Sequence, residues 1–150
     1  MVEHPEEISN EYVRGLVEGE GTFTFSPSGN KKIPVFCLKM HVRDKNLLEL
    51  VRNKLGLKNK VYEYNHQRKD GVKRGPQAML IVREVGSIKN TIIPFFYKKL
   101  KGNKGKQFLE WLEKFGSDSK VPATFKFIFQ LYRSGFYDRK QWFYRWTLNN

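Results

Sequence analysis

The stretch 15-GLVEGEGTFTF-25 predicts a helix that leads directly into a β-strand. Residues 8–19 are expected to form the helix, because Val13, Leu16 and Val17 follow the i, i+3, i+4 spacing of one apolar helix face. The alternation of threonine and phenylalanine that follows is typical of a strand with one buried face. The chain is therefore expected to begin its fold with a helix and a strand joined without a loop.

The rest of the chain repeats this order, which predicts an α+β fold with residues 1–150 as a single domain. Gly21 is expected to end the first helix, and Ser9 or Asn10 to cap its start. The other expected elements are a strand at 22–26, a turn at 27–30, a returning strand at 35–42, a helix at 45–55, a hairpin from 61–68 and 77–85, helices at 88–99, 107–115 and 124–133, and a helical tail at 136–146. Pro94 is expected to kink or shorten its helix. The pattern predicts an antiparallel sheet with helices on one face and an open second face.

Positive charge is concentrated in two segments of the sequence. The chain has 28 Lys and Arg against 15 Asp and Glu, a formal net charge of +13. Residues 31–74 hold 13 basic and 4 acidic residues, and residues 98–106 hold 5 lysines and no acid. Such clustering favours a nucleic acid partner. The alternative is that the lysines only aid solubility, but a solubilising coat would be spread more evenly along the chain.

Other partner and site classes find little support in the sequence. The longest apolar run, around residues 91–96, is too short to span a bilayer, and the acidic N-terminus has no secretory signal, so we expect an intracellular protein without a membrane partner. The single cysteine, Cys37, cannot form an internal disulfide. Since no Cys or His pairs stand at ligand spacing, no structural zinc is expected.

The open face of the predicted sheet is a candidate surface for the major groove of DNA, which admits a two-stranded ribbon. Alternation places Phe36, Leu38, Met40 and Val42 inward and the odd-numbered residues from Val35 to His41 outward. The residues expected to contact DNA are Thr22, Thr24, Ser26, Lys31, Lys32, Lys39, His41, His66, Arg68, Arg74, Gln77, Arg83 and Lys106. An ordinary solvated sheet face is the alternative for any one of them.

Glu20 stands in the last turn of the predicted helix, where the helix dipole disfavours a carboxylate by roughly 0.3–1 kcal/mol. Gly15 and Gly19 share one helix face, which suits the close approach of another backbone. If the same helix of a second copy packs there, two Glu20 carboxylates converge, and Mg²⁺ with its preference for oxygen ligands could hold them beside DNA phosphates. A surface helix with solvated glutamates and a glycine cap is the alternative.

Residues 13-VRGLVEGEG-21 resemble the nine-letter signature of the LAGLIDADG homing endonucleases. The resemblance covers about residues 8–115, and the segment 116–150 is expected to be a C-terminal helical tail. It implies an αββαββα fold with a saddle-shaped antiparallel sheet. A single copy of the motif implies a homodimer in which Tyr12, Gly15 and Gly19 lie at the interface.

The same resemblance implies an intron-encoded, Mg²⁺-dependent nuclease that cuts both strands of a long pseudo-palindromic DNA target and leaves 3′ overhangs. Ca²⁺ is expected to support binding without cleavage. Glu20 resembles the metal-binding acid, with the Gly19 carbonyl as a further ligand. Asp44 occupies the place of a residue that orients the hydrolytic water, and Lys104 that of the basic residue near the scissile phosphate, with Lys106 as the competing assignment.

The sequence departs from the family pattern at three places. The eighth-position acid is Glu20 rather than aspartate, Arg14 replaces a small residue near the expected helix pair, and Val35 and Cys37 are apolar where polar base contacts are expected. Rival functions are an intron RNA maturase or a catalytically inactive DNA-binding protein of the same fold. A further rival is a KH-like RNA-binding module, because 102-GNKG-105 matches its G-x-x-G loop.

Overall fold

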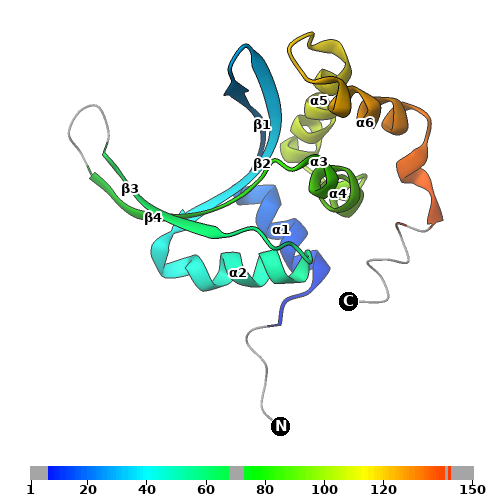
Figure 1. Ribbon diagram of the computed structural model, residues 1–150. Helices are drawn as coiled ribbons and strands as arrows, with labels where there is room; N and C mark the ends of the chain where they lie inside the picture. The colour runs from blue at the N-terminus through cyan, green and yellow to red at the C-terminus, as the bar shows by residue number, and fades with distance from the viewer. Residues whose placement is uncertain (1–6, 68–72, 141, 143–150) are drawn as a thin grey trace.

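The computed structural model describes residues 7–67, 73–140 and 142 of the chain. Its helices and strands are α1 (Asn10–Glu20), β1 (Gly21–Ser28), β2 (Lys31–His41), α2 (Lys45–Lys54), β3 (Val61–Gln67), β4 (Lys73–Val82), α3 (Val85–Ser87), α4 (Ile93–Phe96), α5 (Asn103–Ser117) and α6 (Ala123–Arg133) (Figure 1). Short 3-10 turns span Val42–Asp44 and Phe136–Asp138, and a π turn spans Ile88–Ile92. The order confirms the predicted α+β class and the αββαββα arrangement.

The strands form one curved antiparallel sheet in the order β1-β2-β4-β3. Helices pack on one side of this sheet, and the concave side is left open (Figure 1). Gly21 pairs with Leu38 on β2, and Phe36 on β2 pairs with Val82 on β4, so the three strands share a fixed register. The open concave side is the surface that the sequence predicts for DNA.

An aromatic cluster forms the core between the sheet and α4 and α5. Phe23 of β1 lies 4.9 Å from Phe108, 5.1 Å from Trp111 and 5.4 Å from Phe36, measured between ring centroids. Burying such large rings is the main stabilising contribution of this region. The indole Nε1 of Trp111 donates a 2.7 Å hydrogen bond to the Thr24 carbonyl, which attaches α5 to the edge strand β1.

Several predicted boundaries were wrong for local reasons. Residues 27 and 28 belong to β1 and not to the turn, which is formed by Gly29 and Asn30 with Gly29 at φ 61°. Strand β4 ends at Val82, and Val85 already begins a helix. The helix accommodates Pro94 through a π turn that precedes it. In this turn Ile93 N–H donates to the Ile88 carbonyl, five residues earlier, instead of the usual acceptor four residues earlier.

The stretch 102-GNKG-105 is not the loop that a KH-like module requires. Helix α5 already begins at Asn103, and Gly105 N–H donates to the Gly102 carbonyl at 2.9 Å. A Cβ on Gly105 would lie 2.8 Å from the Leu100 carbonyl oxygen, so glycine is needed for close chain packing. This removes the structural basis for the KH alternative.

The aromatic tail packs against the π turn. Of the helix expected at 136–146, the structure describes a 3-10 turn at Phe136–Asp138 and helical residues at Lys140 and Trp142, while positions 141 and 143–146 lie outside the described residues. The Tyr137 hydroxyl donates a 2.8 Å hydrogen bond to the Lys89 carbonyl, and burial raises the pKa of this phenol. Trp142 Nε1 donates to the Phe136 carbonyl at 3.0 Å. The Tyr137 hydrogen bond thus attaches the 3-10 turn to the π turn.

Candidate functional site

Two carboxylates at the C-terminal end of α1 have different surroundings. Glu18 accepts hydrogen bonds from the backbone N–H groups of Lys101 and Gly102, in the segment before α5. Glu20 is exposed and forms no hydrogen bond or ion pair with any other described residue. The positive charge expected to compensate Glu20 therefore does not come from a direct ion pair within the described chain.

Gly21 allows the strand to leave the helix directly after Glu20. Its φ of −76° is ordinary, so the glycine is not needed for a left-handed conformation. A Cβ at this position would lie 2.6 Å from Val17 Cγ1 and 3.0 Å from the Val17 carbonyl oxygen. Only glycine permits this close turn, which holds Glu20 at the junction of helix and sheet.

Lys104 reaches the same junction from α5. Its Nζ donates a 2.5 Å hydrogen bond to the Gly21 carbonyl, next to Glu20 in the chain. Asp44 lies at the start of α2, and among the described residues its side chain neither caps that helix nor forms a hydrogen bond with Glu20 or Lys104. A hydrogen bond therefore attaches Lys104, but not Asp44, to the end of α1.

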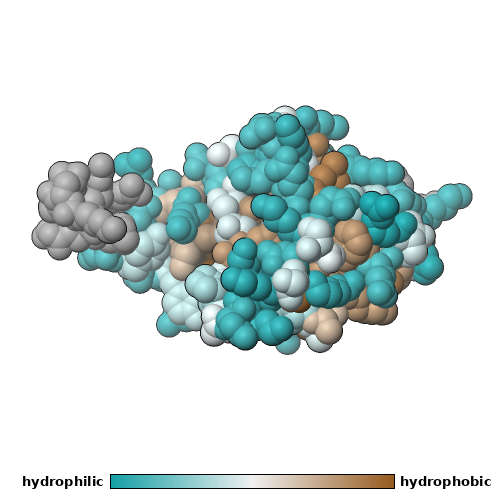
Figure 2. Space-filling view, turned by 90° about the horizontal axis from the view of Figure 1, so that it is seen from above, coloured by the Kyte–Doolittle hydropathy of each residue, from teal (hydrophilic) through white to brown (hydrophobic). Residues whose placement is uncertain are grey.

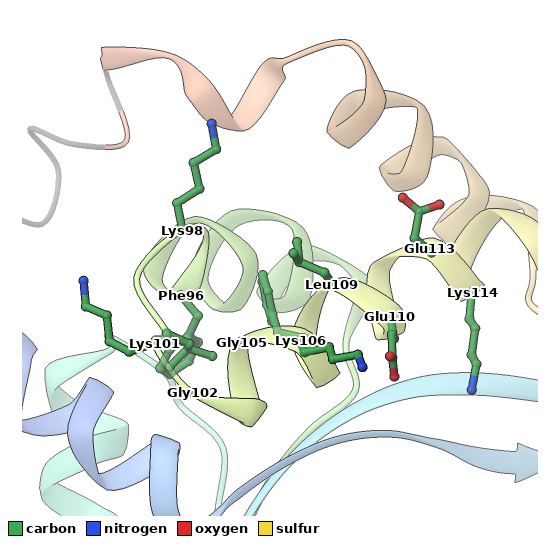
Figure 3. A pocket seen from close by; sticks show the side chains of 12 residues that line it. Phe96, Lys98, Lys101, Gly102, Gly105, Lys106, Leu109, Glu110, Glu113 and Lys114 are labelled. Carbon is green, nitrogen blue, oxygen red and sulfur yellow. The ribbon is translucent and has the colours of Figure 1, made fainter.

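Lys106 points to a different part of the surface. With Lys101 and Lys114 it lines a groove of about 750 Å³ beside α5 (Figure 3). This groove lies between α5 and the segment after α4, not on the open face of the sheet. Of the two competing lysines, only Lys104 contacts the junction that holds Glu20.

One side of α1 is bare in the described structure. Tyr12 is 49% exposed, and a Cβ added to Gly15 or Gly19 would meet no atom within 4 Å. Arg14, the departure from the family pattern near the expected helix pair, faces inward and not toward this side. Its Nε donates a 2.9 Å hydrogen bond to the Phe95 carbonyl, and its guanidinium carbon lies 4.4 Å from the Phe95 ring centroid.

The open face of the sheet carries most of the predicted DNA-contacting residues. Cross-strand pairs put Thr22, Cys37 and Ile81 in one row, and His41 and Gln77 in another. Lys31, Lys39 and Arg83 are exposed, as are Thr22 and Thr24, whereas Ser26, His41 and Gln77 are half-buried.

Val35 and Cys37 lie on the outward register but are not exposed, which corrects the simple alternation. Only 2% of Val35 and 6% of Cys37 is accessible, because neighbouring side chains cover them on the concave face. Burial raises the pKa of the Cys37 thiol, while the charges of Lys39 and Arg83 act in the opposite direction. These two cations therefore lie near Cys37 on the open face.

Four other predicted contacts lie elsewhere or cannot be placed. Lys32 turns to the helical side, where its Nζ forms a 3.1 Å ion pair with Asp118, so it does not join the open face. His66 lies on β3 and Arg74 on β4, and Arg68 falls outside the described residues.

The donor atoms at the end of α1 suit a hard divalent cation. Glu20 supplies a free carboxylate, and the last carbonyl groups of a helix lack intrahelical partners, which leaves the Gly19 oxygen as a further ligand. Within the described ranges no group of three or more His, Cys, Asp or Glu side chains is placed to hold a metal ion. Within the described residues, the end of α1 therefore offers these two oxygen donors and no larger ligand group.

Sequence reasoning missed the structural roles of Glu18 and Arg14. The partners of Glu18 lie 83 and 84 residues away, and the carbonyl bound by Arg14 lies 81 residues away. Periodicity within one helix gives no sign of such contacts. The only available signal was the placement of an arginine between buried valines.

The family model of the LAGLIDADG endonucleases matches residues 13–115. The solved structure of the homing endonuclease I-TnaI is 20% identical with a TM-score of 0.58, and the match covers 95% of this chain and 86% of that one. I-GzeII in complex with its DNA target is 24% identical with a TM-score of 0.59, covering 87% of this chain and 45% of that one. I-SmaMI bound to an uncleaved DNA target with calcium ions is 22% identical with a TM-score of 0.56, covering 85% and 44%.

These structures share the fold of this chain. The chain spans less than half the length of the two DNA-bound proteins, but 86% of the length of I-TnaI. No helix in the described ranges is both long and apolar enough to cross a membrane.

Proposed function

Since this chain belongs to the LAGLIDADG endonuclease family, we propose that it is a homing endonuclease that cuts both strands of a specific DNA site as a homodimer. The observation that carries this proposal is the free Glu20 carboxylate beside the Lys104 contact, at the end of a helix with a bare side. A carboxylate with no structural partner is available for chemistry, and a bare helix side is available for a second copy.

The second copy would complete the oxygen site. If two α1 helices pack through Gly15 and Gly19, each chain contributes one Glu20 carboxylate and one Gly19 carbonyl to the same region. The exposed side chain of Tyr12 lies on this side of the helix and would be buried by the same contact, and Leu16, which already packs partly against the core, would be buried further. The site is therefore incomplete in a monomer and complete in a dimer.

Mg²⁺ fits the proposed donor set, which consists only of oxygen atoms. When bound, such an ion supplies activated water and stabilisation of the leaving oxygen in phosphodiester hydrolysis. In this chain Glu20 and Gly19 would hold it, and the Lys104 ammonium would add positive charge near the phosphate. Asp44, at the start of α2, would orient the hydrolytic water.

DNA would lie on the open face of the sheet, which presents exposed Lys31, Lys39 and Arg83. A twofold dimer would present this face twice, which matches a pseudo-palindromic target. Cutting across the minor groove between the two halves would leave 3′ overhangs. An intron-encoded origin agrees with this activity.

Selection of cleaved duplexes from a randomised library tests the proposal. Parallel reactions contain Mg²⁺, Ca²⁺ or EDTA. We expect a single long, nearly palindromic consensus with 3′ overhangs in Mg²⁺ and bound but intact duplex in Ca²⁺. Specific binding without cleavage in any divalent metal would instead indicate a DNA-binding protein that has lost catalysis.

A further inference from the structure

The open face of the sheet has two chemically different halves. The edge strand β1 presents the hydroxyl groups of Thr22, Thr24 and Ser26. On the other half, the cross-strand register places Met79 of β4 opposite Tyr62 of β3, and Ile81 follows Met79 on the same side. Figure 2 looks down on this face and shows hydrophobic residues in its middle with hydrophilic residues around them.

A shallow cavity of about 550 Å³ lies on the second half. Tyr62, Met79 and Ile81 form its apolar floor, and Lys60 and Arg83 stand at its rim. Tyr62 is 47% exposed, and both Met79 and Ile81 are half-buried, so the floor is accessible from the open side. This cavity contains none of the hydroxyl groups that line the β1 half.

The rim of the cavity is positively charged. The Lys60 ammonium lies 5.4 Å from the Tyr62 ring centroid, and Arg83 is exposed. Glu84 also lines the cavity, and its carboxylate accepts hydrogen bonds from Asn59 Nδ2 at 2.6 Å and Arg83 N–H at 2.9 Å; the two cations outnumber this one anion. An apolar floor with two exposed cations at its edge fits a polyanion that carries an apolar group, which favours DNA over an apolar protein surface.

We propose that this cavity reads thymine in the target through the 5-methyl group of the base. The inference rests on the proposed function, because it requires a duplex on the open face. The methyl group would contact Met79, Ile81 and the Tyr62 ring, while Lys60 and Arg83 hold the flanking phosphates. The two halves of the face would then read DNA by different means, hydroxyl hydrogen bonds at β1 and apolar contact at β3 and β4.

The chemistry of the major groove selects this base. Adenine, guanine and cytosine present only hydrogen-bonding groups at the positions that face the groove, whereas thymine adds a methyl group. The side chains of Met79 and Ile81 carry no strong donor or acceptor, so a polar base edge pressed against them would lose its hydrogen bonds to water. A thymine methyl would instead be buried favourably.

The test uses the full chain and duplexes selected for binding in Ca²⁺. We expect thymine at a fixed distance from the twofold centre of the selected site. Replacing that thymine with deoxyuridine removes only the methyl group and should weaken binding about fourfold, the effect of burying one methylene-sized group. Met79→Gln should abolish this difference and shift the preference toward adenine, because glutamine pairs with its N6 and N7.

Leu109→Gln is the matched control, since Leu109 is 45% exposed on α5, away from the sheet. It should keep the fourfold ratio between thymine and deoxyuridine. A selected site without this thymine, or equal binding of both duplexes, would overturn the inference alone. The absence of any selective DNA binding would overturn the proposed function, and this inference with it. A change in self-association on Met79→Gln, with the thymine ratio intact, would assign the cavity to a protein contact instead.

Discussion

The two sides of helix α1 differ in whether their polar groups form hydrogen bonds or ion pairs with the rest of the described chain. On the inner side Arg14 binds the Phe95 carbonyl and forms a 2.7 Å ion pair with Glu11. On the outer side a Cβ at Gly15 or Gly19 would meet open space, and the Glu20 carboxylate forms no hydrogen bond or ion pair with a described residue. The inner side therefore contributes to the stability of one chain, and the outer side is free for a partner or for chemistry.

The same difference separates two carboxylates that stand only two residues apart. Glu18 holds the segment before α5 through two backbone N–H groups, so its role is to position this segment and hence Lys104. Glu20 holds nothing within the described chain. This lack of a bond within the described chain distinguishes Glu20, the proposed metal-binding acid, from Glu18.

The largest expected effect is that of Glu20→Gln on cleavage. Glutamine keeps the size of the side chain but removes the charge that would hold a divalent cation. We expect the rate of cleavage in Mg²⁺ to fall by about a thousandfold or more, with DNA binding in Ca²⁺ and the melting temperature almost unchanged. Single-turnover cleavage, a binding titration and thermal unfolding measure the three quantities.

Glu18→Gln is the matched control for this substitution. It should lower the free energy of unfolding by about 1 kcal/mol, because two N–H donors lose a charged acceptor, and should reduce cleavage by no more than about tenfold. Equal losses of cleavage in both variants would show that the two carboxylates do not have the separate roles assigned to them.

The next largest effect concerns the inner side of α1. Arg14→Met fills a similar volume but removes the Arg14 hydrogen bond to the Phe95 carbonyl, the contact with the Phe95 ring and the ion pair with Glu11. We expect a loss of about 2–3 kcal/mol in the free energy of unfolding, measured by urea denaturation. The exposed Arg43 provides the control, since Arg43→Met should change stability by less than about 0.5 kcal/mol. A stable Arg14→Met protein with altered self-association would place Arg14 at the outer side after all.

Much of the fold could be predicted from the sequence because its signals are local. The apolar spacing of residues 13–17 and the threonine–phenylalanine alternation after Gly21 correctly gave a helix joined directly to a strand. The repeat of that order gave the sheet with one open face. The candidate site was partly predictable for the same reason, since Glu20 and the glycine face lie within one helix.

The errors arose where contacts between distant segments decide the outcome. The glycines around residues 102–105 suggested a loop, but Gly105 is small because the Leu100 carbonyl packs against it. Lys32 was assigned to the open face, but Asp118, which lies 86 residues further along, holds it on the helical side. Hydrophobic periodicity is read within a short window of the sequence, so it cannot reveal contacts between residues this far apart.

The smallest expected effects on stability come from substitutions of two glycines, Gly15 on the outer side of α1 and Gly21 next to its inner side. Gly15→Ala adds a Cβ to open space and a better helix former, so it should stabilise the single chain by about 1 kcal/mol. Gly21→Ala places a Cβ 2.6 Å from Val17 Cγ1 and should destabilise it by about 1–2 kcal/mol. Denaturation at concentrations where the protein is monomeric measures both changes.

The two glycine substitutions should affect dimer formation differently from the way they affect the stability of the single chain. Gly15→Ala should weaken the dimer about tenfold or more, as measured by sedimentation equilibrium, because a methyl group on the bare side keeps two α1 helices apart. Gly21→Ala acts on the inner side and should change the dimer constant little once the chain is folded. If Gly15→Ala stabilises the monomer and leaves self-association intact, the outer side of α1 is not the dimer contact, and the pairing of two Glu20 carboxylates loses its basis.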